Sequence, residues 1–120
     1  MDNEGDGMKL LAILHVIALI EGNDPRALGL HGEVSKYQLT PIAIQEVNDR
    51  FKTNYTSRMI AIDDVHAKDC AFKYLLILQR FYDCDTEEKL VRGYNGGPRG
   101  WRKSSTESYW KKYQKLKREL

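Results

Sequence analysis

Hydrophobic residues run almost without a break from Leu10 to Ile20, where His15 is the only polar interruption. Apolar positions around nearly the whole circumference of a helix are typical of a central, buried helix. We expect this helix to begin at Met8, after a flexible lead-in at residues 1–7, and to end near Gly22 in a Gly-Asn-Asp-Pro stretch. This run of eleven residues is too short to span a bilayer, and acidic residues precede it, unlike in a signal peptide.

Capping residues and apolar spacing predict two well-defined helices in the middle of the chain. Thr40 as N-cap and Pro41 at the first helical position begin one that runs to about Phe51. The other begins at Asp63 or Asp64 and ends near Tyr82. Its apolar face has helical spacing and consists of Ala67, Cys70, Ala71, Tyr74, Leu75, Leu78 and Phe81.

Two further helices are predicted towards the C-terminus, over 86–92 and from a Ser-Ser-Thr-Glu capping box at 104–107 to about Arg118. Connections are expected at 26–39, 53–59 and 93–98. Because 34–39 is β-like, the first connection is expected to be a small hairpin or an ordered loop. Strand signal is otherwise scarce, so the sequence predicts a single, mostly α-helical domain over residues 8–120.

The cysteines and histidines give no sign of a disulfide or a metal site. Cys70 and Cys84 are fourteen residues apart, which is about 21 Å along one helix, whereas a disulfide needs Cα atoms within about 7 Å. The three histidines lie far apart in sequence, and no phosphate-binding loop motif is present. We therefore expect two free thiols, no metal and no cofactor.

The charge of the chain is unevenly distributed. The net charge is +2, but the segment from Arg99 to Leu120 has eight basic and two acidic residues, so that it carries +6 and the preceding residues carry −4. A basic end of this kind indicates an anionic polymer as a partner. A solvated helix face, with cations near the helix C-terminus, explains it equally well.

Glu21 comes directly after the apolar run, at the end of a helix that must be buried. Burial raises the pKa of a carboxyl group, and a general acid that works near neutral pH needs a raised pKa. A glutamate that simply reaches solvent from the last helical turn fits the position too. Two other segments are weak signals when taken singly: Lys36-Tyr37-Gln38-Leu39, and the glycine-rich stretch Tyr94-Asn95-Gly96-Gly97-Pro98.

Taken in order, these segments resemble the lysozyme-like soluble lytic transglycosylases, including their divergent or phage members. That family has a Glu-Ser pair, a Gly-Leu-Met-Gln stretch and an Ala-Tyr-Asn-Ala-Gly-Pro stretch. Here they read Glu21-Gly22, Ser35-Lys36-Tyr37-Gln38 and Gly93-Tyr94-Asn95-Gly96-Gly97-Pro98. The resemblance covers roughly residues 8–113, and the last motif is its most specific part.

The resemblance implies a lysozyme-like fold with a small hairpin or ordered loop beside a cleft, and peptidoglycan glycan strands as the substrate. Glu21 would be the catalytic acid and base, and Gln38 would line the sugar-binding cleft. Tyr94 would hold the Glu21 side chain, and Asn95 would shape the cleft wall. The resemblance further implies action on the bacterial cell wall. We expect a monomer, and the residues themselves predict no membrane span and no nucleic-acid partner.

Family members often have a further tyrosine that touches the glycan, and Tyr109 and Tyr113 are the candidates, with Tyr109 preferred. Two departures lie beside the cleft. The serine that contacts substrate in the family is Gly22 here, and Gly-Leu-Met is Ser35-Lys36-Tyr37. Substrate detail is therefore expected to differ.

The reaction implied is cleavage of the β-1,4 bond between N-acetylmuramic acid and N-acetylglucosamine. A lytic transglycosylase needs one carboxylate, because the 6-hydroxyl of the sugar attacks. An inverting hydrolase needs a second carboxylate about 6.5–9.5 Å from the first. Glu33 is the only carboxylate in 26–39 and is the candidate for that second role. The transglycosylase is the favoured route, and the inverting muramidase is the alternative.

Two non-enzymatic classes remain open. A glycan-binding module with little catalytic activity would share the same scaffold, because a fold does not determine a function. A nucleic-acid binder is the weakest alternative. Aromatic residues interleave with basic ones near the C-terminus, but the rest of the chain is acidic and has no known binding motif.

Overall fold

The computed structural model describes residues 3–120, and side chains from residue 7 onward. It is mostly helical, with this order of elements: α1 (Asn3–Ile20), α2 (Pro41–Phe51), α3 (Ser57–Ile62), α4 (Asp64–Phe81), α5 (Glu87–Gly96), η1 (Gly100–Arg102), η2 (Ser104–Thr106) and α6 (Glu107–Glu119). The helices share one hydrophobic core. The radius of gyration is 13.3 Å, close to the roughly 13.6 Å expected for one compact domain of this length.

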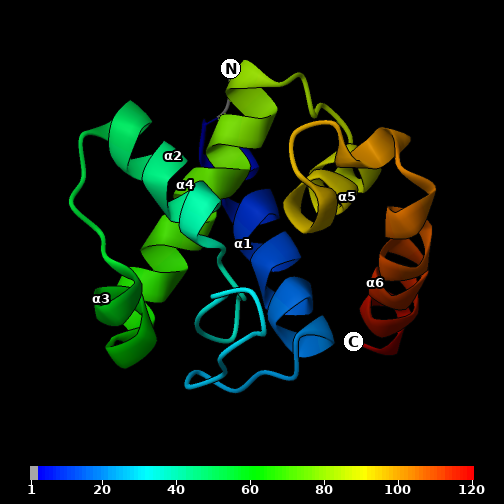
Figure 1. Cartoon of the computed structure of the whole chain (residues 1–120). Helices are drawn as coiled ribbons and strands as arrows, with labels where there is room; N and C mark the ends of the chain where they lie inside the picture. Colours follow the sequence, from blue (N-terminus) through cyan, green and yellow to red (C-terminus); the bar gives the residue numbers. More distant parts are fainter. Residues whose placement is uncertain (1–2) are drawn as a thin grey trace.

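Helix α1 lies in the middle of the molecule (Figure 1). Helices α2, α3 and α4 lie on one side of it and α5 and α6 on the other, while the segment between α1 and α2 loops beneath its C-terminal end. Its buried side chains are Leu10, Ile13, Leu14, Val16, Ile17 and Ala18. The expectation of a central helix is therefore confirmed, and its C-terminus is the point where both sides of the molecule meet.

The start and the surface of α1 differ from the expectation. The helix begins at Asn3, so residues 3–7 belong to it, while residues 1–2 lie outside the described part of the chain. One stripe of α1 faces solvent: Met8 is 72% exposed and Leu11 is 42% exposed. The run of apolar residues predicted burial on every side, but helices packed against α1 cover only part of its circumference.

Helices α2 and α4 confirm their predictions closely. The Thr40 hydroxyl accepts a hydrogen bond from the Ala43 amide at 3.0 Å, and Pro41 is the first residue of α2. The carboxylate of Asp63 accepts from the Val65 amide at 2.9 Å and caps α4. The predicted apolar face of α4 is buried except for Phe81, which is 52% exposed at the end of the helix.

Three local predictions are wrong. Residues 57–59 begin the short helix α3, because the Thr56 hydroxyl caps it by accepting from the Met59 amide at 3.1 Å. Helix α5 continues through Gly96 into the segment expected to be a glycine-rich loop. The predicted capping box at 104–107 is a 3-10 turn instead, and α6 begins only at Glu107.

Thr106, the residue directly before α6, uses its side chain in tertiary contacts. The hydroxyl of Thr106 accepts a hydrogen bond from Arg92 Nε at 2.8 Å and lies 2.7 Å from the Gly100 carbonyl oxygen and 2.9 Å from that of Lys103. Thr106 is buried. Its hydroxyl therefore ties α5 to the turns before α6, and it does not cap the helix.

The segment between α1 and α2 is an ordered loop. Isolated antiparallel bridges join Val34 to Leu28 and to Leu39. The Val34 amide donates to the Leu39 carbonyl at 3.0 Å, and the reverse bond measures 2.9 Å. Of the two forms expected for this segment, the structure has the ordered loop, because the paired stretches are too short to form strands.

Cys70 and Cys84 are both buried and free, as expected. Burial raises the pKa of the Cys70 thiol to about 12, so this thiol stays protonated near neutral pH. Among the described residues, none of the helices is both long and apolar enough to cross a membrane.

The Thr106 contacts predict an order of stability for two variants. Thr106→Val keeps the shape but leaves Arg92 Nε and a buried carbonyl without their partner, so we expect a loss of about 2 kcal/mol in the free energy of unfolding. Thr106→Ser keeps the hydroxyl and loses one buried methyl group, at a cost of about 1 kcal/mol. Urea unfolding measures both, and a Val variant as stable as the Ser variant would contradict the assignment.

Candidate functional site

The backbone at the end of α1 fixes the position of Glu21. Two hydrogen bonds close the helix: the Asn23 amide donates to the Ala18 carbonyl at 2.7 Å, and the Gly22 amide donates to the Leu19 carbonyl at 3.2 Å. Gly22 has φ +92°, the left-handed conformation in which helices commonly end and which favours glycine. The absence of serine at this position therefore has a local reason: the backbone that holds Glu21 favours glycine.

The carboxylate of Glu21 is joined to α6. The Tyr109 hydroxyl donates to Glu21 Oε2 at 3.0 Å. Glu21 is only partly exposed, and Tyr109 is 8% exposed. The hydrogen bond therefore lies largely within the protein, and it connects two residues that are 88 positions apart.

Burial raises the pKa of Glu21 above its ordinary value, and the nearby Glu33 carboxylate raises it further. The hydrogen bond from Tyr109 and the charge of Lys112 act in the opposite direction, because both stabilise the ionised form. Burial is the largest of these effects. Glu21 thus holds its proton to higher pH than a solvated glutamate, which is the property required of a general acid.

Lys112 is a neighbour of Glu21 that the sequence analysis did not include among the site residues. It follows Tyr109 by three positions on α6, so both residues face the same side of the helix. Once Tyr109 is placed beside Glu21, the spacing alone brings Lys112 near the same carboxylate. Nothing in the pattern of the chain pairs α6 with the end of α1, however, so the sequence could not show this.

Glu33 folds back over its own loop. A Cβ atom on Gly29 would stand 2.2 Å from Glu33 Oε2 and 2.8 Å from Gln38 Oε1, so these side chains occupy the space that a residue larger than glycine would need. Glu33 Oε1 is buried and has no hydrogen-bond partner in the described part of the chain. The loop thus brings the side chains of Glu33 and Gln38 together beside Gly29, and the charge of Glu33 acts on Glu21.

Gln38 stabilises the loop through its side-chain amide. Its Nε2 atom donates to the Ser35 carbonyl at 2.8 Å and to the Ala27 carbonyl at 3.4 Å. Its own backbone has φ +47°, and Ser35 has φ +73°. The side-chain nitrogen of Gln38 therefore bonds to the backbone of its own loop. These bonds fix the shape of the loop.

Tyr94 joins the loop to α5, and does not bind Glu21. Its hydroxyl donates to the Tyr37 carbonyl at 2.7 Å, and its ring packs edge-on against Tyr74 at 5.6 Å between centroids. Burial is the main reason for the raised pKa of Tyr94, and the charge of Glu21 adds to it, so the two residues are near each other. Tyr109 therefore makes the hydrogen bond that the family resemblance implied for Tyr94.

The two remaining candidates lie outside this group. Asn95 is exposed near the end of α5, and its side chain makes no hydrogen bond within residues 7–120. The Tyr113 hydroxyl donates to Glu87 Oε2 at 2.6 Å, so Tyr113 joins α6 to the start of α5. Of the two tyrosines proposed to reach the site, only Tyr109 does.

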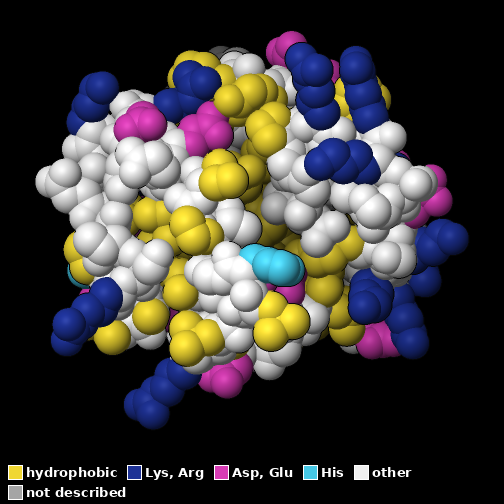
Figure 2. All heavy atoms as spheres, in the orientation of Figure 1, with side chains coloured by type: hydrophobic (Ala, Val, Ile, Leu, Met, Phe, Trp, Pro, Cys, Tyr) yellow, Lys and Arg dark blue, Asp and Glu magenta, His cyan; other side chains and the backbone are white. Residues whose placement is uncertain are grey.

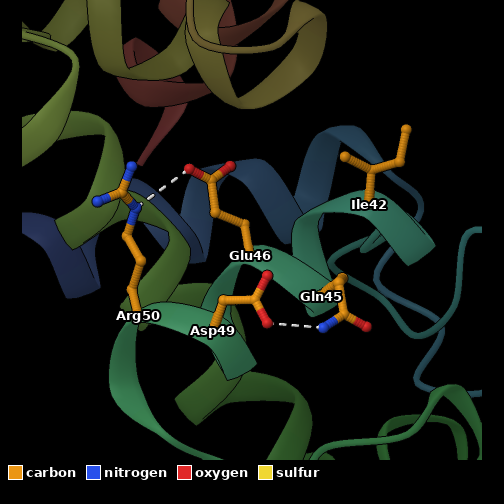
Figure 3. A pocket seen from close by; sticks show the side chains of 5 residues that line it. All are labelled: Ile42, Gln45, Glu46, Asp49 and Arg50. Carbon is orange, nitrogen blue, oxygen red and sulfur yellow. Dashed lines mark hydrogen bonds and ion pairs between the residues drawn. The ribbon is translucent and has the colours of Figure 1, made fainter.

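Figure 3 shows a hollow elsewhere, along the exposed face of α2. Its polar side chains pair with one another one helical turn apart: Gln45 Nε2 donates to Asp49 Oδ1 at 2.8 Å, and Arg50 Nε lies 3.3 Å from Glu46 Oε1. Such pairs are typical of a solvated helix face. We therefore do not choose this hollow as the candidate functional site.

No cluster of three or more metal-binding side chains occurs in the described residues. In the comparisons with known proteins, no family model, no curated protein and no solved structure matches the chain. The function is therefore inferred from the geometry around Glu21.

The tyrosine hydroxyls provide a matched pair of variants. Tyr109→Phe removes the donor that favours ionised Glu21, so we expect the Glu21 pKa to rise above its value in the unmodified protein. Tyr113→Phe removes a donor to Glu87 and is expected to leave Glu21 unchanged. NMR titration of labelled carboxyl groups measures both, and an equal effect of the two substitutions on Glu21 would contradict the assigned contact.

Proposed function

We propose that the chain cleaves the β-1,4 bond between N-acetylmuramic acid and N-acetylglucosamine in peptidoglycan, with Glu21 as the general acid. The observation that carries this proposal is the state of Glu21: a carboxyl group at a helix end, partly buried, with a raised pKa and a tyrosine hydroxyl at 3.0 Å. A glycosidase needs a protonated carboxyl group to deliver a proton to the leaving oxygen. Tyr109 fixes the direction in which that group points.

The arrangement around Glu21 supports a polymer as the substrate. Glu21 lies where α1, the ordered loop and α6 meet. Figure 2 shows hydrophobic side chains in a depression down the middle of one face, between the α2–α4 side and the α5–α6 side. A lysozyme-like fold has its cleft between an ordered loop and helices, and we propose that fold for this chain.

We favour the transglycosylase route, in which Glu21 acts alone. It would protonate the leaving oxygen and then, as a carboxylate, accept the proton of the 6-hydroxyl that attacks the anomeric carbon. This route needs one carboxylate, and one of the two Glu33 carboxylate oxygens, Oε1, is buried away from water. Glu33 then has a different role: its charge helps to keep Glu21 protonated.

The inverting muramidase is the second candidate, because Glu33 is the carboxylate that interacts electrostatically with Glu21. An inverting glycosidase uses two carboxyl groups, one as acid and one as base. In that mechanism Glu33 Oε2 would activate a water molecule on the opposite face of the sugar. A glycan-binding module without catalysis is the third candidate, and it predicts binding to cell walls without cleavage.

Glu21→Gln should reduce the cleavage of purified cell walls by about 10²- to 10⁴-fold, the usual contribution of a positioned general acid. Clearing of walls and release of soluble fragments measure the loss. The variant should bind walls as before. Equal cleavage by the variant would contradict the role of Glu21, and the absence of cleavage by both proteins would favour the glycan-binding module.

Stability provides the control for correct folding of this variant. The folded-state pKa of Glu21 is raised, so Glu21 favours folding while it is protonated, and that advantage is lost as the pH rises through the folded-state pKa. Glu21→Gln, which is never charged, should therefore have a Tm at neutral pH at or above that of the unmodified protein. The difference should shrink towards pH values below the ordinary glutamate pKa.

Glu33→Gln separates the two catalytic routes. A transglycosylase should keep most of its activity and release anhydro-muramyl ends, while its Glu21 pKa falls because a nearby negative charge is gone. An inverting hydrolase should lose about 10²-fold or more. Mass spectrometry of the products distinguishes them, since reducing muramyl ends from the unmodified protein would overturn the transglycosylase route.

A further inference from the structure

A second hollow, of about 370 Å³, lies where the end of α4, the first turn of α5 and the turn η1 meet. This size is within the range of small-ligand sites. Its lining is rich in aromatic and basic side chains and consists of Phe81, Tyr82, Asp83, Lys89, Pro98, Arg99, Trp101 and Arg102. None of these residues contributes to the contacts around Glu21.

Two cations approach one indole ring in this hollow, and a third cation lines it. Lys89 Nζ and the Arg102 guanidinium carbon each lie 4.8 Å from the centre of the Trp101 ring. Arg99 lines the same hollow. Cations are attracted to an indole ring, so Trp101 holds the two side chains near each other despite their equal charge.

The basic residues around this hollow outnumber the acidic ones. Lys89 pairs with Asp85 at 3.3 Å, and Asp83 is the one acidic residue in the lining. Arg99 and Arg102 make no side-chain hydrogen bond or ion pair with residues 7–120. Two guanidinium groups thus face the hollow with unused donors, in a place that would suit an anion.

The chemistry of the hollow indicates which anion. A guanidinium group presents a planar set of donors that matches the oxygens of a phosphate, and arginine is the side chain best suited to this pairing. A nucleic acid would need a free aromatic face for a base to stack on. Both cations already approach the Trp101 ring, so it is poorly placed for a base, and the phosphate group remains as the feature recognised.

We propose that this hollow binds the phosphate groups of a phosphodiester-linked polyol polymer of the cell wall. Arg99 and Arg102 bind a phosphate, and Trp101 holds Arg102 in place. The identity of the polymer rests on the proposed function, which brings the protein to the wall, whereas the anion site itself does not. Bound there, the protein stays on the wall between successive cleavage events at Glu21.

The test uses the full chain with Glu21→Gln, so that binding is measured without cleavage. Purified walls that carry poly(glycerol phosphate) are compared with the same walls after hydrofluoric acid has removed the phosphodiester polymer. Sedimentation with increasing protein gives the Kd. We expect the Arg99→Gln/Arg102→Gln double variant to bind untreated walls about tenfold more weakly, with a shallower dependence on salt, and to bind treated walls as its parent does.

The matched control is Lys111→Gln/Lys115→Gln, which removes the same charge from exposed positions of α6. This control should weaken binding to untreated walls far less, and both double variants should keep their Tm. Equal weakening by the two double variants, or equal binding of the parent to both kinds of wall, would overturn the proposal. So would tighter binding to a single-stranded oligonucleotide than to walls.

The same variants in the protein with Glu21 intact separate this proposal from the proposed function. Arg99→Gln/Arg102→Gln should cleave short soluble glycan fragments at the unmodified rate, because neither residue lies in the Glu21 site. Loss of wall binding with cleavage retained supports the anion site. Absence of cleavage in every protein, with the difference in wall binding retained, would contradict the proposed function alone.

Discussion

The hydrogen bond between Tyr109 and Glu21 joins the two parts of the molecule on which the candidate site depends. It connects the end of the central helix α1 with α6 at 3.0 Å, and both partners are largely removed from solvent. A buried carboxylate without such a partner would be costly. With it, Glu21 stays in one orientation while burial still keeps its pKa above the ordinary value.

The ordered loop between α1 and α2 carries Glu33, whose charge acts on Glu21. The shape of this loop comes from hydrogen bonds and not from strands. Backbone bonds between Val34 and Leu39, the side-chain amide of Gln38 and the hydroxyl of Tyr94 hold it in place. Gly29 leaves the room that the side chains of Glu33 and Gln38 fill. These contacts bring a second carboxylate near Glu21 and give that carboxylate an electrostatic effect, whether or not it takes part in the reaction.

The basic residues near the C-terminus lie at two separate places on the surface. Lysine and arginine side chains are more numerous on the α5–α6 side of the face in Figure 2. Lys112 lies near Glu21 and partly offsets the rise in the Glu21 pKa. Arg99 and Arg102 line a separate hollow with Trp101. The uneven charge of the sequence thus divides into two surfaces with different chemistry, one beside the candidate acid and one suited to an external anion.

The sequence by itself determined the class of the fold, the central position of α1, and the limits of α2 and α4, because apolar spacing and capping are local properties. It also singled out Glu21 as a carboxylate at the end of a buried helix. Only the tertiary structure decided which tyrosine binds it and that the hydroxyl of Thr106 ties α5 to the turns before α6. Those outcomes depend on partners far away along the chain, which no local pattern can specify.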